Sequence, residues 1–384
     1  MRRAWAAAAL TLALGADGRA WAADPYVEAA AMPKGDQALI LDVVFGRLGA
    51  AERLSARMTA DPRPTPDLAE RAWPLLCEDD YRTGRYRAGA ASCGQAAAIG
   101  AEAHVLEIVQ LLADQPPVKA EGAARVILSP GGRIAVRSGD FAGEGIVDTG
   151  AQISVMMQSV ALAAHVRLLG VSHSVETPTA DIQGQIGMIP EVRIGRARLQ
   201  NLPVLVLPDD QLVIANGSVR LPFILGLDGL AAFERIAWLD HGRALALGAA
   251  APVSAPGAAP LTWHPLGVAA PVDGVEGRRA AHLDSGANLS YLTETGLGLL
   301  PPQERTRLGA SRRWVGGVGG AVEEDIERLP RATLSLAGHS LTLVDVDVAM
   351  ESDTGEVARI GEDVLGRFSA VVLDFIAMKI SVKP

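Results

Sequence analysis

Aromatic residues are scarce in this chain. Phe, Trp and Tyr make up 4% of its 384 residues, whereas 49% of the residues are hydrophobic and 21% are charged. This composition is that of a globular protein, whose cores must consist mainly of Leu, Val, Ile and Ala. The length is sufficient for two or three domains.

The signatures of several enzyme classes are missing as well. The sequence contains no GxSxG nucleophile elbow, no phosphate-binding loop and no HExxH zinc motif. Its seven histidines are scattered, and its two cysteines do not form a C-x-x-C pair. We therefore expect no metal site and no cofactor.

Only two cysteines are present, Cys77 and Cys93, with 15 residues between them. In an exported protein such a pair predicts one disulfide. Closing a loop of this length stabilises the fold by about 3 kcal/mol in the chain-entropy model.

The N-terminus resembles a secretory signal. Arg2 and Arg3 precede an apolar run over residues 4–14, and Ala20-Trp21-Ala22 offers a small-x-small cleavage site. The alternative is a membrane anchor, but a spanning helix needs about 20 apolar residues and this run is shorter. We predict that residues 1–22 are a cleaved signal peptide, that the protein is periplasmic or secreted, and that no stable membrane span remains.

The charge balance is acidic. The full chain carries −9 at pH 7, and removal of residues 1–22 takes away a net +2 and leaves −11. An acidic protein is a poor match for the phosphate backbone of nucleic acids. We therefore expect no nucleic-acid partner.

The first part of the chain, residues 24–113, is predicted to be an α-helical domain. The expected helices are rich in Ala, Leu and Glu and cover 37–47, 51–57, 68–76 and 101–112. Residues 77–98 have the spacing of a turn between two antiparallel helices. This segment is similar to one tetratricopeptide-type helical pair, and a plain helical hairpin is the alternative.

From residue 124 onward, short apolar runs separated by Gly and Pro indicate β-structure. Two short strands are expected within 192–207, around Gly195 and Pro203, and a further edge strand at 379–382. Residues 248–260 consist almost entirely of Ala, Pro, Gly and Ser, which is typical of a linker that buries nothing. The linker divides this part into two lobes, 124–247 and 261–384.

The two lobes repeat each other. Ile146-Val147-Asp148-Thr149-Gly150-Ala151 recurs as His282-Leu283-Asp284-Ser285-Gly286-Ala287. The offset between the copies is 136 at the aspartates, 135 from Gly226 to Gly361 and 134 from Asp240 to Asp374. Three landmarks in nearly constant register indicate an internal duplication. A third copy, Asp353-Thr354-Gly355, lacks the preceding apolar strand and is predicted to be a surface turn.

A strand that ends in Asp and Gly can present a carboxylate at a tight turn. Two such turns can bring Asp148 and Asp284 together, and two close carboxylates share one proton, so that one acts as base and the other as acid. His282 stands two residues before Asp284, and we interpret it as a structural or solvent-facing residue.

The two Asp-(Thr/Ser)-Gly-Ala motifs that follow apolar strands, and the later Gly-x-Asp segments, resemble those of retropepsin-like aspartic proteases, in a bacterial, tandem-fused form. The resemblance covers residues 124–384 and implies a mainly β, pseudo-dimeric acid-protease fold with two β-barrel lobes behind the small helical domain. A homodimer is then not required for the active site. Asp148 and Asp284 would be catalytic, and the dyad would be supported by Thr149, Gly150, Ser285 and Gly286.

The family also implies a flap over the dyad. The glycine-rich segment 314–320 resembles such a flap, with Val315, Gly316, Gly317 and Gly319 as substrate-binding candidates. The corresponding segment of the first lobe, with Ile182 and Gly184, is poorer in glycine. A simple flexible hairpin is the alternative.

These features predict an exported aspartic endopeptidase that acts on a peptide or protein substrate. A catalytically silent pseudo-protease that binds peptides or proteins is the alternative. The helical domain is a candidate for recruiting a protein partner. Ala151 and Ala287 replace the Ser or Thr of pepsin-like motifs, so we expect activity at milder acidity than pepsin, because a hydroxyl there would lower the pKa of a carboxyl.

Overall fold

The computed structural model describes residues 24–61, 63–101, 105–170, 173–176, 181–214, 219–264, 267–317, 320–349 and 356–384. The expected signal peptide and the third Asp-Thr-Gly copy lie outside these ranges. Within them, the helices are all too short or too polar to cross a membrane.

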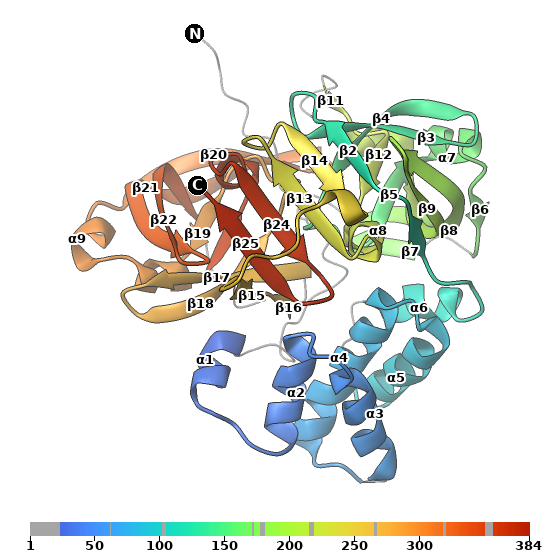
Figure 1. The fold of residues 1–384 in the computed structure, drawn as a ribbon, viewed down its shortest axis with the longest axis horizontal. Coiled ribbons are helices and arrows are strands. Elements are labelled where there is room, and N and C mark those ends of the chain that lie inside the picture. Colours follow the sequence, from blue (N-terminus) through green and yellow to red (C-terminus); the bar gives the residue numbers. More distant parts are fainter. Residues whose placement is uncertain are drawn as a thin grey trace.

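The predicted helical region is present and lies on one side of the two β lobes (Figure 1). Its helices are α1 (Pro25–Ala30), α2 (Asp36–Val44), α3 (Ala50–Ala60), α4 (Pro66–Arg82), α5 (Tyr86–Ala98) and α6 (Leu106–Leu112). The turn from α4 to α5 passes through Gly84, whose φ of 70° favours glycine. The predicted disulfide between Cys77 and Cys93 joins these two helices.

The helical region contacts the linker and the second lobe. The hydroxyl of Tyr26 in α1 donates to the carbonyl of Pro260 at 2.7 Å, and the amide of Ala280 donates to Asp24 at 2.7 Å. The guanidinium of Arg82, at the end of α4, lies over the Trp263 ring at 5.0 Å. The inner residues of α4 to α6 join the main core, whereas α2, α3 and the first part of α4 form a cluster of their own.

The first lobe is a closed ring of strands in the order β9-β5-β12-β4-β3-β8, in which β8 also pairs with β9. The ring strands are β3 (Arg133–Ser138), β4 (Phe141–Val147), β5 (Ser154–Met157), β8 (Asp181–Ile194), β9 (Ala197–Leu207) and β12 (Phe223–Leu225). Shorter strands join its edges: β1 (Lys119–Glu121), β6 (Arg167–Leu168) and β7 (His173–Glu176), while β10 (Val213–Ile214) pairs with β11 (Val219–Arg220). Two short helices, α7 (Gln158–Ala163) and α8 (Leu227–Ala232), complete it.

The second lobe repeats this ring as β17-β18-β23-β19-β22-β21, closed by pairing of β17 with β21. Its strands are β16 (Thr262–His264), β17 (Gly267–Gly274), β18 (Gly277–Leu283), β19 (Tyr291–Thr293), β20 (Gly309–Gly317), β21 (Gly320–Leu336), β22 (His339–Ala349) and β23 (Ala358–Ile360). The helices are α9 (Pro302–Arg305) and α10 (Glu362–Leu365). The prediction of a mainly β part with two β-barrel lobes is confirmed.

A third sheet joins the lobes, and Figure 1 shows its strands between them. Its order is β15 (Ala259–Pro260), β25 (Lys379–Lys383), β24 (Ala370–Asp374), β13 (Arg235–Leu239), β14 (Ala244–Leu247) and β2 (Ala124–Ile127). At its centre β13 of the first lobe pairs antiparallel with β24 of the second, with Ala237 opposite Val372. These two residues are 135 apart, which is the repeat offset, so a pseudo-two-fold axis passes between them.

Some local expectations differ from the structure. Residues 192–207 belong to two longer strands, and Pro203 lies inside β9 opposite Met188 instead of ending a strand. The extended backbone accepts the fixed φ of proline, and the neighbours Leu202 and Val204 are fully buried. In the linker 248–260, Ala251 is buried and β15 pairs with β25, so the linker does bury apolar surface and β25 is not the edge strand.

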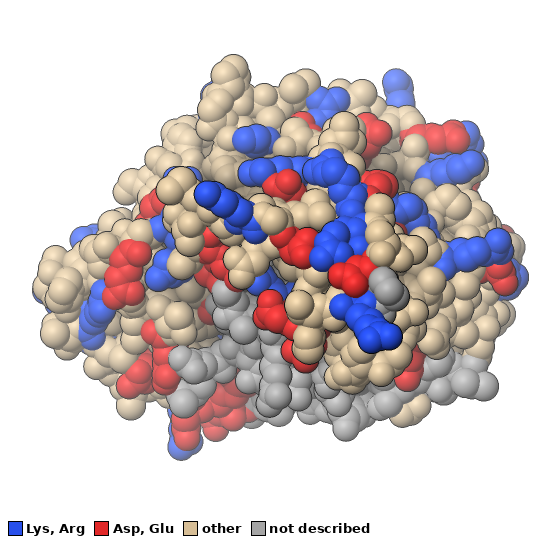
Figure 2. All heavy atoms as spheres, turned by 90° about the horizontal axis from the view of Figure 1, so that it is seen from below, with Lys and Arg blue, Asp and Glu red and all other residues tan. Residues whose placement is uncertain are grey.

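The surface carries charges of both signs. Figure 2 shows Lys and Arg side chains interspersed with Asp and Glu on one face of the molecule. The ion pairs of the described residues include Arg85 with Asp79 at 2.7 Å and Arg71 with Glu28 at 2.8 Å.

Candidate active site

Asp148 and Asp284 occupy equivalent places in the two lobes. Each directly follows a ring strand, β4 or β18, that runs parallel to the strand preceding a short helix. The amide of Asp148 donates to the carbonyl of Leu225 at 3.0 Å, and the amide of Asp284 donates to that of Ile360 at 2.9 Å. The same backbone pairing therefore fixes where each carboxylate leaves its strand.

The structure brings the two carboxyls together at the junction of the lobes. Each Oδ1 accepts from the glycine amide of its own turn, from Gly150 at 2.8 Å and from Gly286 at 3.0 Å. A Cβ placed on Gly150 would lie 2.6 Å from Cγ of Asp284, and one on Gly286 would collide with Asp148. Glycine is therefore required because each carboxyl packs against the turn of the other lobe.

The hydroxyls of Thr149 and Ser285 brace the two turns. The amide of Thr149 donates to Oγ of Ser285 at 3.1 Å, and the amide of Ser285 donates to Oγ1 of Thr149 at 3.0 Å. Each hydroxyl then donates to the other lobe: Thr149 to the carbonyl of Leu283 at 2.7 Å, and Ser285 to that of Val147 at 2.9 Å. Four hydrogen bonds thus cross between the lobes directly beneath the carboxyls.

The surroundings of the two carboxyls favour a shared proton. Both side chains are fully buried. Burial, and then the charge of Asp284, raise the pKa of Asp148 well above its ordinary value, while the Gly150 amide acts in the opposite direction. Two adjacent carboxylates cannot both ionise easily in such a site, so Asp148 retains its proton more readily than an ordinary aspartate.

Sequence reasoning gave no role to a second pair of acidic residues that support the turns. Asp228 accepts from the amide of Ser154 at 3.1 Å and from its hydroxyl at 2.8 Å, and Asp363 accepts equivalent bonds from Ser290 at 2.8 and 2.7 Å. The sequence does contain a repeated pattern that points to these pairs. A serine follows each motif aspartate by six residues, and an aspartate follows Gly226 and Gly361 by two.

The second lobe also contains a buried polar cluster that sequence reasoning did not detect. Arg359 in β23 contacts Oδ2 of Asp284 through Nη1 at 3.4 Å and Glu356 through Nη2 at 3.1 Å. Glu356 accepts from the Tyr291 hydroxyl at 3.1 Å, and its Oε2 lies 3.6 Å from Nδ1 of His282. His282 is fully buried, so it is not solvent-facing.

The flap candidates lie on two hairpins. In the second lobe β20 pairs with β21, with Val315, Gly316 and Gly317 opposite residues 322, 321 and 320; Gly319 lies outside the described residues. In the first lobe Ile182 and Gly184 lie on β8 and pair with β7. Gly184 is buried, and a Cβ there would lie 2.6 Å from Leu205, so its glycine serves packing against β9.

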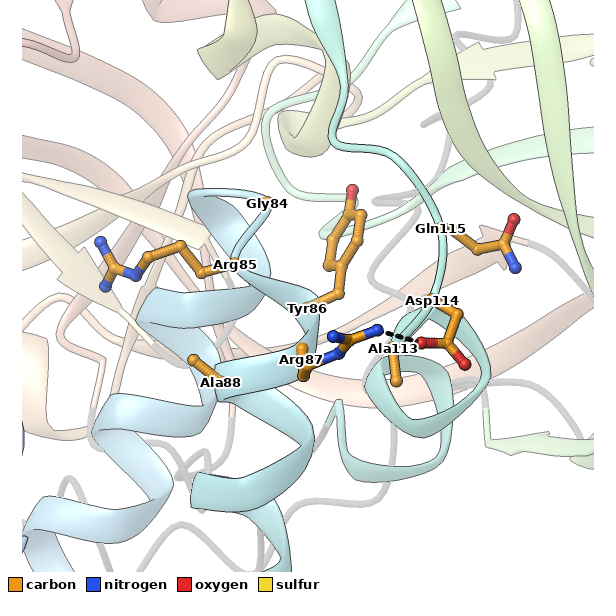
Figure 3. Close-up of a pocket in the computed structure, with 8 residues that line it drawn as sticks. All are labelled: Gly84, Arg85, Tyr86, Arg87, Ala88, Ala113, Asp114 and Gln115. Carbon is orange, nitrogen blue, oxygen red and sulfur yellow. Dashed lines mark hydrogen bonds and ion pairs between the residues drawn. The ribbon is translucent and has the colours of Figure 1, made fainter.

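A cavity of about 400 Å³ lies elsewhere, between α5 and the segment after α6 (Figure 3). Its walls include Arg85, Tyr86 and Arg87, and the last of these pairs with Asp114 at 2.5 Å. None of the dyad residues lines it. Within the described ranges, groups of three or more His, Cys, Asp or Glu side chains that could hold a metal ion are absent.

Comparisons with known proteins find similarity in part of this chain. Residues 134–228 match the family model described as aspartyl protease. Among solved structures, the chain is similar to a retropepsin-like aspartic protease from Rickettsia conorii, with 16% identity and a TM-score of 0.25 over 34% of this chain and 92% of that one. No curated protein matches. The matched segment contains Asp148, Ser154 and Asp228.

We predict that Thr149→Val destabilises the protein by about 1–3 kcal/mol, because it leaves the Ser285 amide and the Leu283 carbonyl without their partner. Thr149→Ser retains the hydroxyl and is expected to remain close to wild type. The free energy of unfolding, measured by chemical denaturation, distinguishes them. Equal stabilities of the Val and Ser variants would show that the brace contributes little.

A second prediction concerns Asp228. Burial raises the pKa of Asp228 to about 7, against hydrogen bonds from Ser154 and Gly229 that lower it. The ordinary value is 3.8, so between these values the folded state holds a proton that the unfolded state has released. Stability therefore falls as pH rises through this window and levels off above it.

Asp228→Asn cannot ionise, so its stability relative to wild type should increase from about pH 5 to about pH 8. Unfolding free energies at both pH values provide the measurement. A constant difference between Asp228→Asn and wild type would contradict the prediction.

Proposed function

We propose that this chain, whose first lobe matches the aspartyl protease family model, is an exported endopeptidase that hydrolyses peptide bonds through an Asp148/Asp284 dyad. The family match supports an aspartic protease in general. The observation that carries the specific assignment is the meeting of the two duplicated turns: each carboxyl lies against the glycine of the other turn, above reciprocal hydroxyl bonds.

The mechanism follows from one shared proton. The ionised carboxylate removes a proton from a water molecule, whose oxygen attacks the carbonyl carbon of the scissile bond, while the protonated carboxyl donates to the carbonyl oxygen. The tetrahedral intermediate collapses when the C–N bond breaks and the leaving nitrogen takes a proton. The raised pKa of Asp148 keeps a protonated member available at milder acidity. Both carboxyls are fully buried. A peptide can therefore reach them only after the residues that cover them move aside.

Asp148→Asn and Asp284→Asn should each abolish hydrolysis of an unstructured protein substrate, because either change removes the shared proton or its acceptor. The sequence offers a matched control, Asp353→Asn in the third Asp-Thr-Gly copy, which should retain activity. Cleavage is measured by proteomic profiling of fragments, with a pepstatin-type inhibitor added to wild type.

The pseudo-protease alternative has a different outcome. A peptide-binding module would bind without cutting, so fragment profiles of wild type and Asp284→Asn would be identical. The presence of both aspartates, both hydroxyl residues and both glycines in one braced arrangement favours catalysis. Recruitment of a protein partner by the helical domain stays a prediction.

Export is part of the proposal and has its own test. A buried disulfide between Cys77 and Cys93 fits an oxidising compartment better than the cytosol. We expect the mature protein to begin near residue 23 and to contain no free thiol. Intact mass measurement of protein recovered from the periplasm or the medium checks both. A full-length, fully reduced product in the cytosol would contradict export.

A further inference from the structure

The two lobes differ at the positions that flank the catalytic strands. In the second lobe Arg359 pairs with His282 on one side and with Tyr291 on the other. In the first lobe Ile224 pairs with Ile146 and Val155 at the same register positions. Three apolar residues beside Asp148 are thus replaced by three polar ones beside Asp284.

The replacement places a cation against one member of the dyad. Nη1 of Arg359 lies 3.4 Å from Oδ2 of Asp284, the oxygen that does not accept from the turn amides of Gly286 and Ala287. The guanidinium is almost fully buried, with 7% of its side chain exposed. Asp148, by contrast, follows a strand whose flanking residues are apolar.

Resting on the proposed function, we propose that Arg359 is a positioning residue that holds Asp284 as the ionised, base-acting member of the dyad and leaves Asp148 as the protonated member. A cation stabilises the carboxylate form of the group it touches. The lobes of a symmetric dyad can exchange these roles, whereas this chain assigns them permanently.

Several titratable groups around Asp284 enter this balance. Asp148 contacts it from the first lobe and Arg359 from β23, while His282 of β18 and Tyr291 of β19 contact Glu356. Glu356, which precedes β23, binds Arg359 at 3.1 Å and offsets part of its charge. Arg313 of β20 lies over the Tyr291 ring at 5.0 Å, and Arg359 at 5.2 Å.

Arg359 keeps its charge despite burial. Burial disfavours the guanidinium form, but Glu356, Tyr291 and Asp284 together raise the pKa of Arg359 above its ordinary value. Asp148 behaves in the complementary way, since burial and then the charge of Asp284 raise the pKa of Asp148. Both pKa shifts agree with the contact of Arg359 with Asp284.

The test compares the pH dependence of kcat/KM among variants. Arg359→Met removes the cation, so the acidic limb of the profile should move to higher pH by about 1 unit. The shift is small because the carboxylate of Glu356 already offsets part of the charge of Arg359. Glu356→Gln removes the opposing carboxylate, and the same limb should move to lower pH. Arg359→Lys retains the charge, so the acidic limb of its profile should stay close to that of wild type. The same is expected of Ile224→Met, at the equivalent position of the first lobe.

Opposite shifts separate the proposal from simple loss of packing, which would not depend on the sign of the deleted charge. Should Arg359→Met fail to fold because Glu356 is left buried without its partner, the Arg359→Met/Glu356→Gln double variant replaces it. Its acidic limb should lie above that of Glu356→Gln. Unchanged limbs, or shifts of both single variants in one direction, would overturn the proposal.

A second readout does not require hydrolysis. The carboxyl carbon of Asp284 is followed by 13C NMR with labelled aspartate and assigned with Asp284→Asn. It should titrate at higher pH in Arg359→Met than in wild type. A shifted titration in a protein that cuts nothing would leave this inference standing and reject the protease function. An unshifted titration would reject the inference even in an active enzyme.

Discussion

The exchange of hydrogen bonds between Thr149 and Ser285 is the constraint on which the active-site arrangement depends. Each hydroxyl accepts from one backbone amide of the opposite lobe and donates to one backbone carbonyl of that same lobe. These two side chains therefore hold the two turns at a fixed distance. Only glycine fits at positions 150 and 286, because the carboxyl of the opposite turn occupies the space of a Cβ.

The rest of the molecule supports this contact. Pairing of β13 with β24 joins the lobes about the pseudo-two-fold axis, and a Ser–Asp pair behind each turn repeats on both sides. The helical region then adds contacts to the linker through Tyr26 and to the second lobe through Arg82. Since α4 to α6 share the main core, this region is part of the folded body.

Duplication gives the dyad its geometry, but the second lobe departs from symmetry in its electrostatics. Arg359, Glu356 and His282 form a buried polar cluster where the first lobe has aliphatic residues. Burying such groups is unfavourable unless they are paired. The cluster lies against one catalytic carboxyl, so the free energy spent on burying it serves to distinguish two otherwise equivalent acids.

The sequence by itself determined the duplication, the two motif aspartates, their hydroxyl neighbours, the helical start and the disulfide pair, because each leaves a local pattern or a constant spacing. It did not reveal that Pro203 lies within a strand or that Ala251 is buried, since neighbouring strands decide both. The roles of Ser154 and Asp228 depend on a contact across 74 residues. Only the tertiary structure placed Arg359 beside Asp284, because strand pairing sets which side chain meets a carboxylate and a single arginine in a sequence carries no sign of its partner.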